Sequence, residues 1–436
     1  MSPTQRWAAL TARIPGGRDG RRMLAVALVD RTGNGLWAAT SVLYFTYVTH
    51  LSVAQVGTLA AAAGVVGVAG APVGGRLADR LPLTRVLAAC QVLRAAAALG
   101  LLVTTDFTSL LVCSALAGFG DRAASVLTKL YGTRVAGAER VRYQAVNRTV
   151  ANVGWALGGL GAAAALAAGT TTVYRILLLG DSLSFVAAAL ITLSCAEAAA
   201  PARIVAGGSR PAPGARTTNP WRDRTYLAYV ATDTVLFLDD AIFKVGLSLW
   251  AVHATDAPHG LVPLLMVLNN VLVVGLQVPL ARFGATTSAA RGLLLPLSLT
   301  FLASGVAMAA SAVDGAVPAS IALTVAAAGF TLAEMLHATV SWELSVALAP
   351  EESQGSYLGV HGLAQASQRA VGPLAVTAAI ATGPLGWTAF GTVIAAACLA
   401  QHRLVRPRPE PSAPSPAGPA GGEPLTTGRA RSGDLG

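Results

Sequence analysis

The sequence has few charged residues for its length, and this scarcity excludes most soluble proteins. Of the 436 residues, 12% are charged and 54% are hydrophobic, and the mean hydropathy is +0.58. A soluble domain carries about twice that share of charge. A membrane protein needs less, because lipid instead of water solvates its outer surface. The composition therefore predicts an integral membrane protein.

Lysine and cysteine are also scarce, and their pattern indicates neither nucleic acid nor a metal. The chain has a net charge of +10, with 29 Arg and only 2 Lys, and the arginines cluster between apolar segments without interleaved aromatic residues. We therefore expect no nucleic-acid partner. The four cysteines lie in apolar segments without a C-x-x-C pair, so we expect no metal and no cofactor. The sequence also lacks H-E-x-x-H and G-x-x-x-x-G-K, which argues against an enzyme and against ATP drive.

Long apolar segments are what the sequence has in abundance. A bilayer core needs about 20 residues of helix. We predict twelve spans, at 23–49, 56–77, 84–104, 108–131, 144–168, 172–196, 226–252, 261–281, 289–312, 316–343, 356–382 and 385–402. Residues 197–225 and 406–436 are rich in Pro, Gly and Arg, which is typical of a flexible linker and a disordered tail. The predicted organisation is a cytoplasmic segment (1–22), a six-helix bundle (23–196), the linker, a second bundle (226–405) and the tail.

The basic residues are distributed unequally between the two sets of loops. With the N-terminus inside, 25 of the 31 basic residues fall in the cytoplasmic segments, and the opposite loops carry none. This asymmetry is what the positive-inside rule describes. We therefore expect a multi-pass protein of the cell (plasma) membrane with an uncleaved first span and both termini in the cytoplasm.

The two halves are weakly similar to each other. "LAVALVD" (24–30) aligns with "LAYVATD" (227–233), which places Asp30 on Asp233, and "ALAGF" (115–119) aligns with "AAAGF" (326–330). The offset between matching segments grows from 203 to 214 along the chain, as loop insertions would produce. The pattern indicates two parallel repeats related by an axis along the membrane normal.

A loop motif adds a family resemblance to this topology. The loop between the second and third spans reads "GRLADRLPLTR", in which Gly75, Asp79 and Arg80 match the G-x-x-x-D-R-x-G-R-[RK] motif of the major facilitator superfamily. Pro82 replaces the second glycine of the motif, and Arg85 follows the position of its basic pair. The chain thus resembles these secondary transporters. The resemblance implies an all-α membrane protein of twelve helices in two parallel six-helix repeats, with spans one, four, seven and ten around a central cavity.

The matched loop has a physical role in this interpretation. Asp79 can bind the N–H groups or arginines of neighbouring helices in one conformation only, so it can hold the cytoplasmic side shut. We therefore predict that Gly75, Asp79, Arg80 and Arg85 form a conformational latch. The alternative is a solvated pair of loop charges.

Glycines in the fifth span resemble a second motif, G-x-x-x-G-P-x-x-G-G, found in exporters of this family. The span contains Gly154, Gly158 and Gly161 without the proline, whereas the repeat mate in span eleven contains Gly372 and Pro373. Small residues at this spacing allow helix backbones to approach closely. We predict a packing role for all five residues, and the resemblance favours export.

Charges inside the predicted spans are costly and indicate function or pairing. A carboxylate in an apolar cavity can bind and release a proton, because burial disfavours its charged form. Our candidates for proton coupling share this setting on the cavity spans: Asp30, Asp233, Asp240 and Glu334. The candidate counter-charges are Arg31, Asp121, Arg122, Lys244 and Arg369.

Spacing and depth predict specific contacts among these residues. Asp30 and Arg122 lie at similar depths, which predicts an Asp30–Arg122 or an Asp121–Arg31 contact, whereas Arg94 is expected to snorkel. Asp240 and Lys244 share a helix face and can pair. Asp233 and Asp240, seven residues apart, share a face, and Asp239 points about 100° away. His337 and His361 are interpreted as packing residues, His337 with a hydrogen bond.

The sequence thus predicts a monomeric, proton-coupled antiporter that exports a small amphipathic organic compound across the lipid bilayer. Three alternatives remain open: uptake of a metabolite, a membrane enzyme or sensor without transport, and static ion pairs in place of coupling sites. A further alternative is that the first span begins at Thr32 and leaves Asp30 among the headgroups.

Overall fold

The computed structural model describes residues 14–166, 170–197, 219–258 and 260–405. The predicted tail (406–436), most of the predicted linker and residues 1–13 lie outside the described residues, as does the side chain of Arg369. Within these ranges the chain forms helices and turns and no strand.

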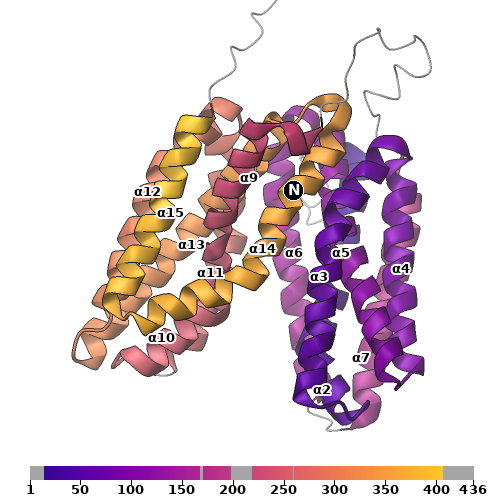
Figure 1. The fold of residues 1–436 in the computed structure, drawn as a ribbon, viewed down its shortest axis with the longest axis horizontal. Helices are drawn as coiled ribbons and strands as arrows, with labels where there is room; N and C mark the ends of the chain where they lie inside the picture. Colours follow the sequence, from indigo (N-terminus) through magenta and orange to yellow (C-terminus); the bar gives the residue numbers. More distant parts are fainter. Residues whose placement is uncertain (1–13, 167–169, 198–218, 259, 406–436) are drawn as a thin grey trace, which may run out of the picture. The chain divides into compact units, whose positions relative to one another are not determined.

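Long helices make up each half of the described chain. The first half contains α2 (Gly17–Tyr47), α3 (Val53–Arg80), α4 (Leu83–Val103), α5 (Phe107–Ala136), α6 (Arg140–Leu166) and α7 (Thr171–Leu193). The second half contains α9 (Arg224–Leu236), α10 (Leu247–Ala254), α11 (Leu261–Ala281), α12 (Thr287–Ala310), α13 (Ala316–Ala347), α14 (Gln354–Ala381) and α15 (Pro384–Leu404). Figure 1 shows the helices of each half grouped together.

The two halves meet along a small number of helices. In the first half α2 packs on α6 and α7, and α5 packs on α3 and α4; in the second, α12 packs on α13 and α15. Between the halves, α3 and α5 contact α14, and α6 contacts α11 and α13. A site between the halves is therefore walled by helices that are far apart in the sequence.

Local sequence explains where several helices begin and end. Ser52 and Gln55 form a capping box at the start of α3, and the Asp106 carboxylate accepts from Ser109 N at the start of α5. Leu81 is extended because it precedes Pro82, which ends α3 at Arg80. Glu197 then accepts hydrogen bonds from the first backbone N–H groups of α4. We call the end of the bundle that contains Arg80, Glu197, Arg224 and Glu343 the linker end.

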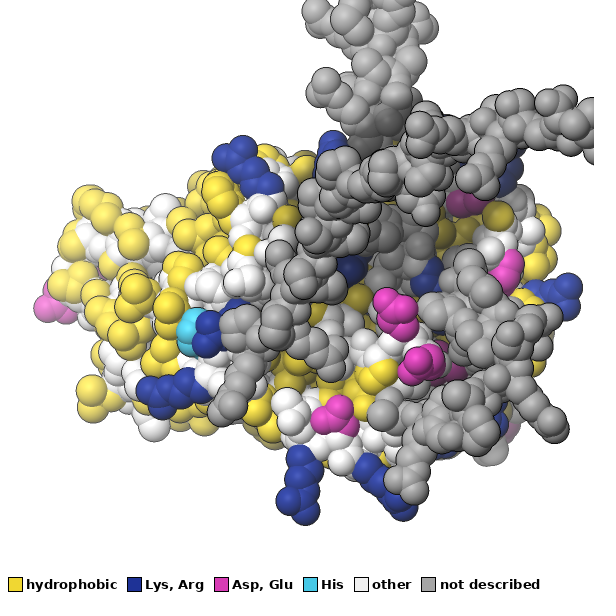
Figure 2. Space-filling model, turned by 90° about the horizontal axis from the view of Figure 1, so that it is seen from above, with side chains coloured by type: hydrophobic (Ala, Val, Ile, Leu, Met, Phe, Trp, Pro, Cys, Tyr) yellow, Lys and Arg dark blue, Asp and Glu magenta, His cyan; other side chains and the backbone are white. Residues whose placement is uncertain are grey.

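The outer surface is apolar, as expected for a lipid-facing protein. Eight helical stretches of the described residues are long and apolar enough to cross a membrane. Large side chains such as Val65, Val103 and Leu385 are 73%, 85% and 79% exposed, which is unfavourable in water and favourable in lipid. Figure 2, seen from above, shows extensive hydrophobic side chains on the left of the view and Lys and Arg side chains mostly around its rim. The number of crossings and the sides of the termini stay predictions.

Two predicted spans differ from the observed helices. The first helix begins at Gly17, before the predicted span at 23–49, and Asp30 is only 6% exposed within the protein. Whether the membrane-spanning part begins before or at Thr32 stays a prediction. The predicted span 226–252 is not one α-helix, because α9 ends at Leu236, a 3-10 turn follows at Phe237–Asp239, and a π-helix at Ile242–Gly246 precedes α10. Such breaks rotate the side chains that follow them relative to a regular helix.

Candidate functional site

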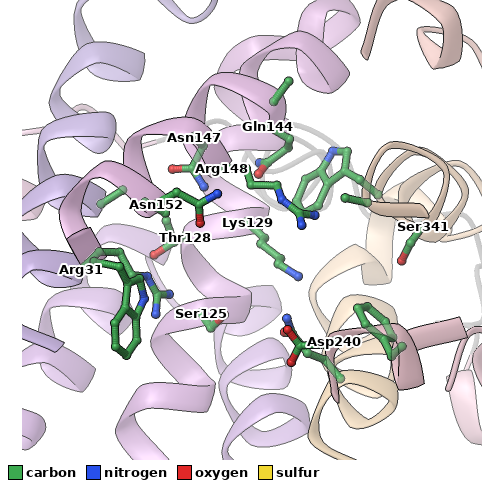
Figure 3. Close-up of a pocket in the computed structure, with 18 of the residues that line it drawn as sticks. Arg31, Ser125, Thr128, Lys129, Gln144, Asn147, Arg148, Asn152, Asp240 and Ser341 are labelled. Atoms are coloured by element: carbon green, nitrogen blue, oxygen red, sulfur yellow. The ribbon is translucent and has the colours of Figure 1, made fainter. Parts of the chain in front are cut away.

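A cavity of about 380 Å³ lies between the halves. Its walls come from α2, α4, α5 and α6 of the first half and from α11, α13, α14 and the irregular segment around residues 237–244 of the second. Figure 3 shows polar and charged side chains from both halves pointing into this space. A volume of this size suits a small organic molecule.

A buried arginine organises the charges on the first-half wall. Arg94 of α4 is 3% exposed and lies 2.5 Å from Asp30 and 3.4 Å from Asp121. Its guanidinium also donates to Asn34 Oδ1 and Gln91 Oε1, both at 2.9 Å, and its Cζ lies 3.9 Å from the centre of the Phe185 ring. The group is thus held by charge, hydrogen bonds and a ring face together.

Arg94 corrects the predicted pairing on this wall. The sequence pointed to Arg122 or Arg31 as the partner across the helices, and the structure gives that role to Arg94, between Asp30 and Asp121. Arg31 and Arg122 lie 3.7 Å and 3.9 Å from their sequence neighbours Asp30 and Asp121. The expectation that Arg94 snorkels is wrong, because two carboxylates in the interior hold it there.

Two histidines and two aspartates form a buried network on the second-half wall. Asp233 is 0% exposed and lies 2.8 Å from His361 Nε2 and 3.4 Å from His337 Nε2. His337 Nδ1 is 3.1 Å from Asp239. Ser341 Oγ and Gln401 Nε2 donate to Asp233 at 2.7 and 3.2 Å. Among the described residues His337 is hydrogen-bonded through Nδ1 to Asp239, and its Nε2 approaches Asp233 without a hydrogen bond. An imidazole placed between two carboxylates can carry a proton from one to the other once it bonds to both.

The irregular backbone of this segment explains two wrong predictions. Asp239, expected to point away from Asp233, joins it through His337, whereas Asp240 pairs with Lys244 and is 40% exposed. The 3-10 turn at Phe237–Asp239 lies between Asp233 and Asp240 and changes the rotation per residue, so regular α-helical geometry does not describe how these two side chains are related. The predicted Asp240–Lys244 pair is present. His361, interpreted from sequence as a packing residue, is a direct partner of Asp233.

One ion pair joins the two halves inside the cavity. Arg148 of α6 donates to Glu334 of α13, and Asn269 of α11 donates to the other Glu334 oxygen at 3.1 Å. The two side chains are partly exposed, at 28% and 22%. Sequence reasoning named Glu334 and missed Arg148, because a partner 186 positions away leaves no local signal.

Further contacts between the halves lie at the linker end. The Asp79 carboxylate accepts from Gly355 N at 2.9 Å, Ser356 N at 2.8 Å and Ser356 Oγ at 2.6 Å, at the first turn of α14. Arg140 makes a two-pronged ion pair with buried Glu343, with distances of 2.9 and 2.6 Å. These contacts fasten α3 to α14 and α6 to α13.

Of the other residues of the predicted latch, Gly75 lies at the contact between the halves, whereas the two arginines lie on the surface. A Cβ on Gly75 would lie 2.1 Å from the Gly355 oxygen, so α3 and α14 touch through their backbones there. Arg80 and Arg85 are exposed. The arginine near Asp79 is instead Arg134, at 4.0 Å.

Two of the four predicted packing glycines, Gly154 and Gly158, lie against the backbone of α2. A Cβ on Gly158 would lie 2.1 Å from Thr32 O of α2, and one on Gly154 would lie 2.9 Å from Leu28 O. Gly161 has more room, with Leu36 at 3.3 Å. Gly372 faces Ala241 at 2.9 Å, and Pro373 lies inside α14. Close packing of α2 on α6 positions Asp30 beside the cavity.

Within the described ranges, His, Cys, Asp and Glu side chains form no group of three or more that could hold a metal ion. The polar groups of the cavity suit binding and proton transfer by side chains.

Comparison with known protein families assigns the sequence to one of them. The family model of the Major Facilitator Superfamily matches residues 23–373. No curated protein sequence matches the chain.

Solved structures with the same fold are distant in sequence. A bacterial homologue of the iron transporter ferroportin, in the outward-facing state, has 16% identity over 89% of this chain and 98% of its own, with a TM-score of 0.67. The proton:xylose symporter XylE, bound to 6-bromo-6-deoxy-D-glucose, has 13% identity over 88% and 95%, with a TM-score of 0.69. The E. coli fucose:proton symporter FucP has 15% identity over 88% and 97%, with a TM-score of 0.63.

Proposed function

The chain belongs to the major facilitator superfamily, a family of multi-pass membrane transporters, and we propose that it is a proton-coupled antiporter that exports a small amphipathic organic compound by alternating access. Its substrate site is the cavity between the halves, and its coupling residues are among Asp30, Asp233, Asp240 and Glu334.

The observation that carries this proposal is the Arg148–Glu334 pair, which links the halves within the cavity. Protonation of Glu334 removes its charge and weakens the link, so proton binding favours the state in which the halves have moved apart at this point. A substrate that displaces Arg148 has the same effect. Such a pair couples proton and substrate to one conformational change.

The proposed topology follows the charge asymmetry of the loops. Twelve helices cross the plasma membrane in bundles 23–196 and 226–405, with both termini and the linker in the cytoplasm and one chain as the working unit. The linker end is then cytoplasmic. Because Asp79 and Arg140 fasten the halves at that end, this conformation is outward-facing.

Proton-driven uptake is the second candidate, favoured by the fold shared with two proteins named as proton symporters. The two candidates differ in the direction of proton flow. In an exporter of the antiport type the proton moves against the compound, and in a symporter it moves with the compound.

Proteoliposomes that contain the pH-sensitive dye pyranine test the proposal. A panel of amphipathic organic compounds is added under an imposed pH gradient, and proton flux and compound movement are followed together. We expect at least one compound to exchange for protons, and Glu334→Gln to abolish the proton flux. Glu139→Gln is the matched control, because Glu139 is an exposed residue paired with Arg142, and it should behave as wild type. Compound transport at an unchanged rate after a protonophore collapses the gradient would refute proton coupling.

A further inference from the structure

The wall of the cavity formed by α5, α6 and the end of α13 contains four side chains that can donate hydrogen bonds. Among the residues that the structure describes, Arg148 donates to Glu334 and the other three make no side-chain hydrogen bond. We call the residues Lys129, Gln144, Arg148 and Trp342 the donor wall. All four line the cavity. Figure 3 shows Lys129, Gln144 and Arg148 near one another and directed toward the same space.

Lys129 differs from the other cations of this cavity. Arg94, Arg148 and Lys244 each have a carboxylate partner. In the part of the chain that the structure describes, Lys129 has no hydrogen bond or ion pair, and its Nζ lies 5.6 Å from the centre of the Trp342 ring. An ammonium group with no carboxylate at ion-pair distance is unfavourable in a buried site unless a ligand supplies a counter-charge in contact with it.

Two neutral donors of the same wall are also unsatisfied. Gln144 Nε2 and Trp342 Nε1 are buried atoms that find no hydrogen-bond partner among the described residues. Gln144 Nε2, from α6, lies 2.9 Å from where a Cβ on Gly132 of α5 would be. Gly132 is about one helical turn beyond Lys129 on α5, so Gln144 Nε2 is close to that turn. Unpartnered buried donors are costly, and an acceptor in a bound ligand would satisfy them.

The charge around the donor wall points to the sign of that ligand. Among the described residues, six Arg and Lys side chains and five Asp and Glu side chains line the cavity, so cations exceed carboxylates by one. Phe237 and Trp155 add apolar surface to the lining. Asn147 Oδ1 and Gln277 Oε1 are unpartnered acceptors of the same cavity, which a donor group elsewhere on the ligand could meet.

We propose that the transported compound is an organic anion, whose carboxylate or phosphate oxygens accept from Lys129, Gln144 and Trp342 while its apolar body lies against Phe237 and Trp155. This inference rests on the proposed function, since it assigns the substrate class of the same cavity. Arg148, released from Glu334 when that residue is protonated, is then available to the same anion.

Four probes with one aromatic body and different charge test the inference. They are 2-naphthoate, 2-naphthyl phosphate, the neutral 2-naphthamide and the cationic (2-naphthyl)methylammonium. Binding to the purified full-length chain in neutral detergent is measured by isothermal titration calorimetry at one pH. We expect at least one of the two anions to bind about tenfold or more tightly than the amide, and the ammonium probe to bind weakest. Preference for the carboxylate over the phosphate, or the reverse, identifies which anion the wall fits.

Variants locate the effect at Lys129. Lys129→Gln should weaken anion binding about 10- to 100-fold and leave amide binding unchanged, because a hydrogen bond to a charged group is worth about 1.5–3 kcal/mol. Lys129→Arg should retain most of the affinity. Arg142→Gln, which removes one positive charge from an exposed residue outside the cavity, should bind as wild type.

Several results would overturn the inference. Equal or undetectable binding of all four probes, tighter binding of the amide or the ammonium, or a Lys129→Gln variant with wild-type anion affinity would each do so. The four-probe comparison in wild type decides the matter if Lys129→Gln does not fold. The calorimetric assay uses no pH gradient, so it tests the substrate class separately from proton coupling. If anions bind here but no compound exchanges for protons in proteoliposomes, the proposed coupling alone is refuted. If a cationic compound exchanges for protons there, the anion class alone is refuted.

Discussion

The contact of Asp79 with the first turn of α14 predicts a large effect of one conservative substitution. Asp79→Asn keeps the shape of the side chain but removes its charge and one of its two acceptor oxygens. The carboxylate now accepts three hydrogen bonds, at 2.9, 2.8 and 2.6 Å, from Gly355 and Ser356. We expect the variant to open the linker end.

The magnitude follows from the lost interactions. A hydrogen bond to a charged group contributes about 1.5–3 kcal/mol, and a carboxylate at a helix N-terminus adds about 0.3–1 kcal/mol. With one acceptor retained, the fastened state should lose about 2–4 kcal/mol, which is about a 30- to 1,000-fold shift of the conformational equilibrium. The shift is large because the substitution acts mainly on the fastened state. There, the asparagine would leave backbone donors of α14 unsatisfied, whereas in the separated state water solvates the side chain and the donors alike.

Distance measurement between spin labels tests this prediction. Labels on cysteines at Leu81, which is 48% exposed, and at the exposed Glu352 report on the gap between α3 and the start of α14. With the four native cysteines replaced, wild type should give one short distance, and Asp79→Asn should add a dominant longer one.

An exposed acidic residue near the same end of the bundle provides the control. Glu139→Gln removes an acidic charge near the same end from an exposed pair with Arg142, and exposed pairs contribute only about 0–1 kcal/mol. Its distances should match wild type. An unchanged distance distribution in Asp79→Asn would refute the latch, and an equal change in Glu139→Gln would attribute the effect to net charge.

Two further substitutions test how the bundle is held together. Gly158→Ala should destabilise the protein by about 1–3 kcal/mol in thermal unfolding, because the new Cβ would lie 2.1 Å from Thr32 O. The control is the adjacent Gly159→Ala, whose Cβ would meet nothing within 4 Å and which should keep or raise stability. Equal effects of the two variants would refute the backbone contact. Arg94→Met should cost about 3–5 kcal/mol, because it removes the nearest cation from buried Asp30 and leaves only Arg31, 3.7 Å away. Adding Asp30→Asn should restore part of the loss, and strictly additive effects would contradict direct pairing.

Sequence reasoning located helices well and helix–helix contacts poorly. Apolar length identifies the segments because each helix must satisfy its own backbone and face lipid. Glycine spacing predicted close helix packing at Gly158, and the structure shows that the partner there is α2, whose backbone would clash with any larger residue. These signals are local and can be read from a few neighbouring residues.

Pairing of charges could not be read in this way. Regular helical geometry separated Asp239 from Asp233, but the helix changes to a 3-10 turn at Phe237–Asp239, and both carboxylates lie beside His337. Nothing in the sequence near residues 237–246 indicates that break. Arg94 could have been found, because an arginine in the middle of an apolar span needs a buried partner. The Arg140–Glu343 pair could not, since its members are 203 positions apart.

The charged contacts divide into two groups with different consequences for alternating access. The Arg94 network lies within the first half and the Asp233 network within the second, so rigid movement of one half against the other leaves both intact. The contacts of Asp79, Arg140 and Arg148 each cross between the halves, so the same movement must break them. Of these, the Arg148–Glu334 pair lies in the cavity, where proton and substrate can both reach it. A ligand shifts an equilibrium only through contacts that differ between its two states. Glu334 is therefore the strongest of the coupling candidates, and neutralising Asp233 should lower stability without changing the distance between the halves.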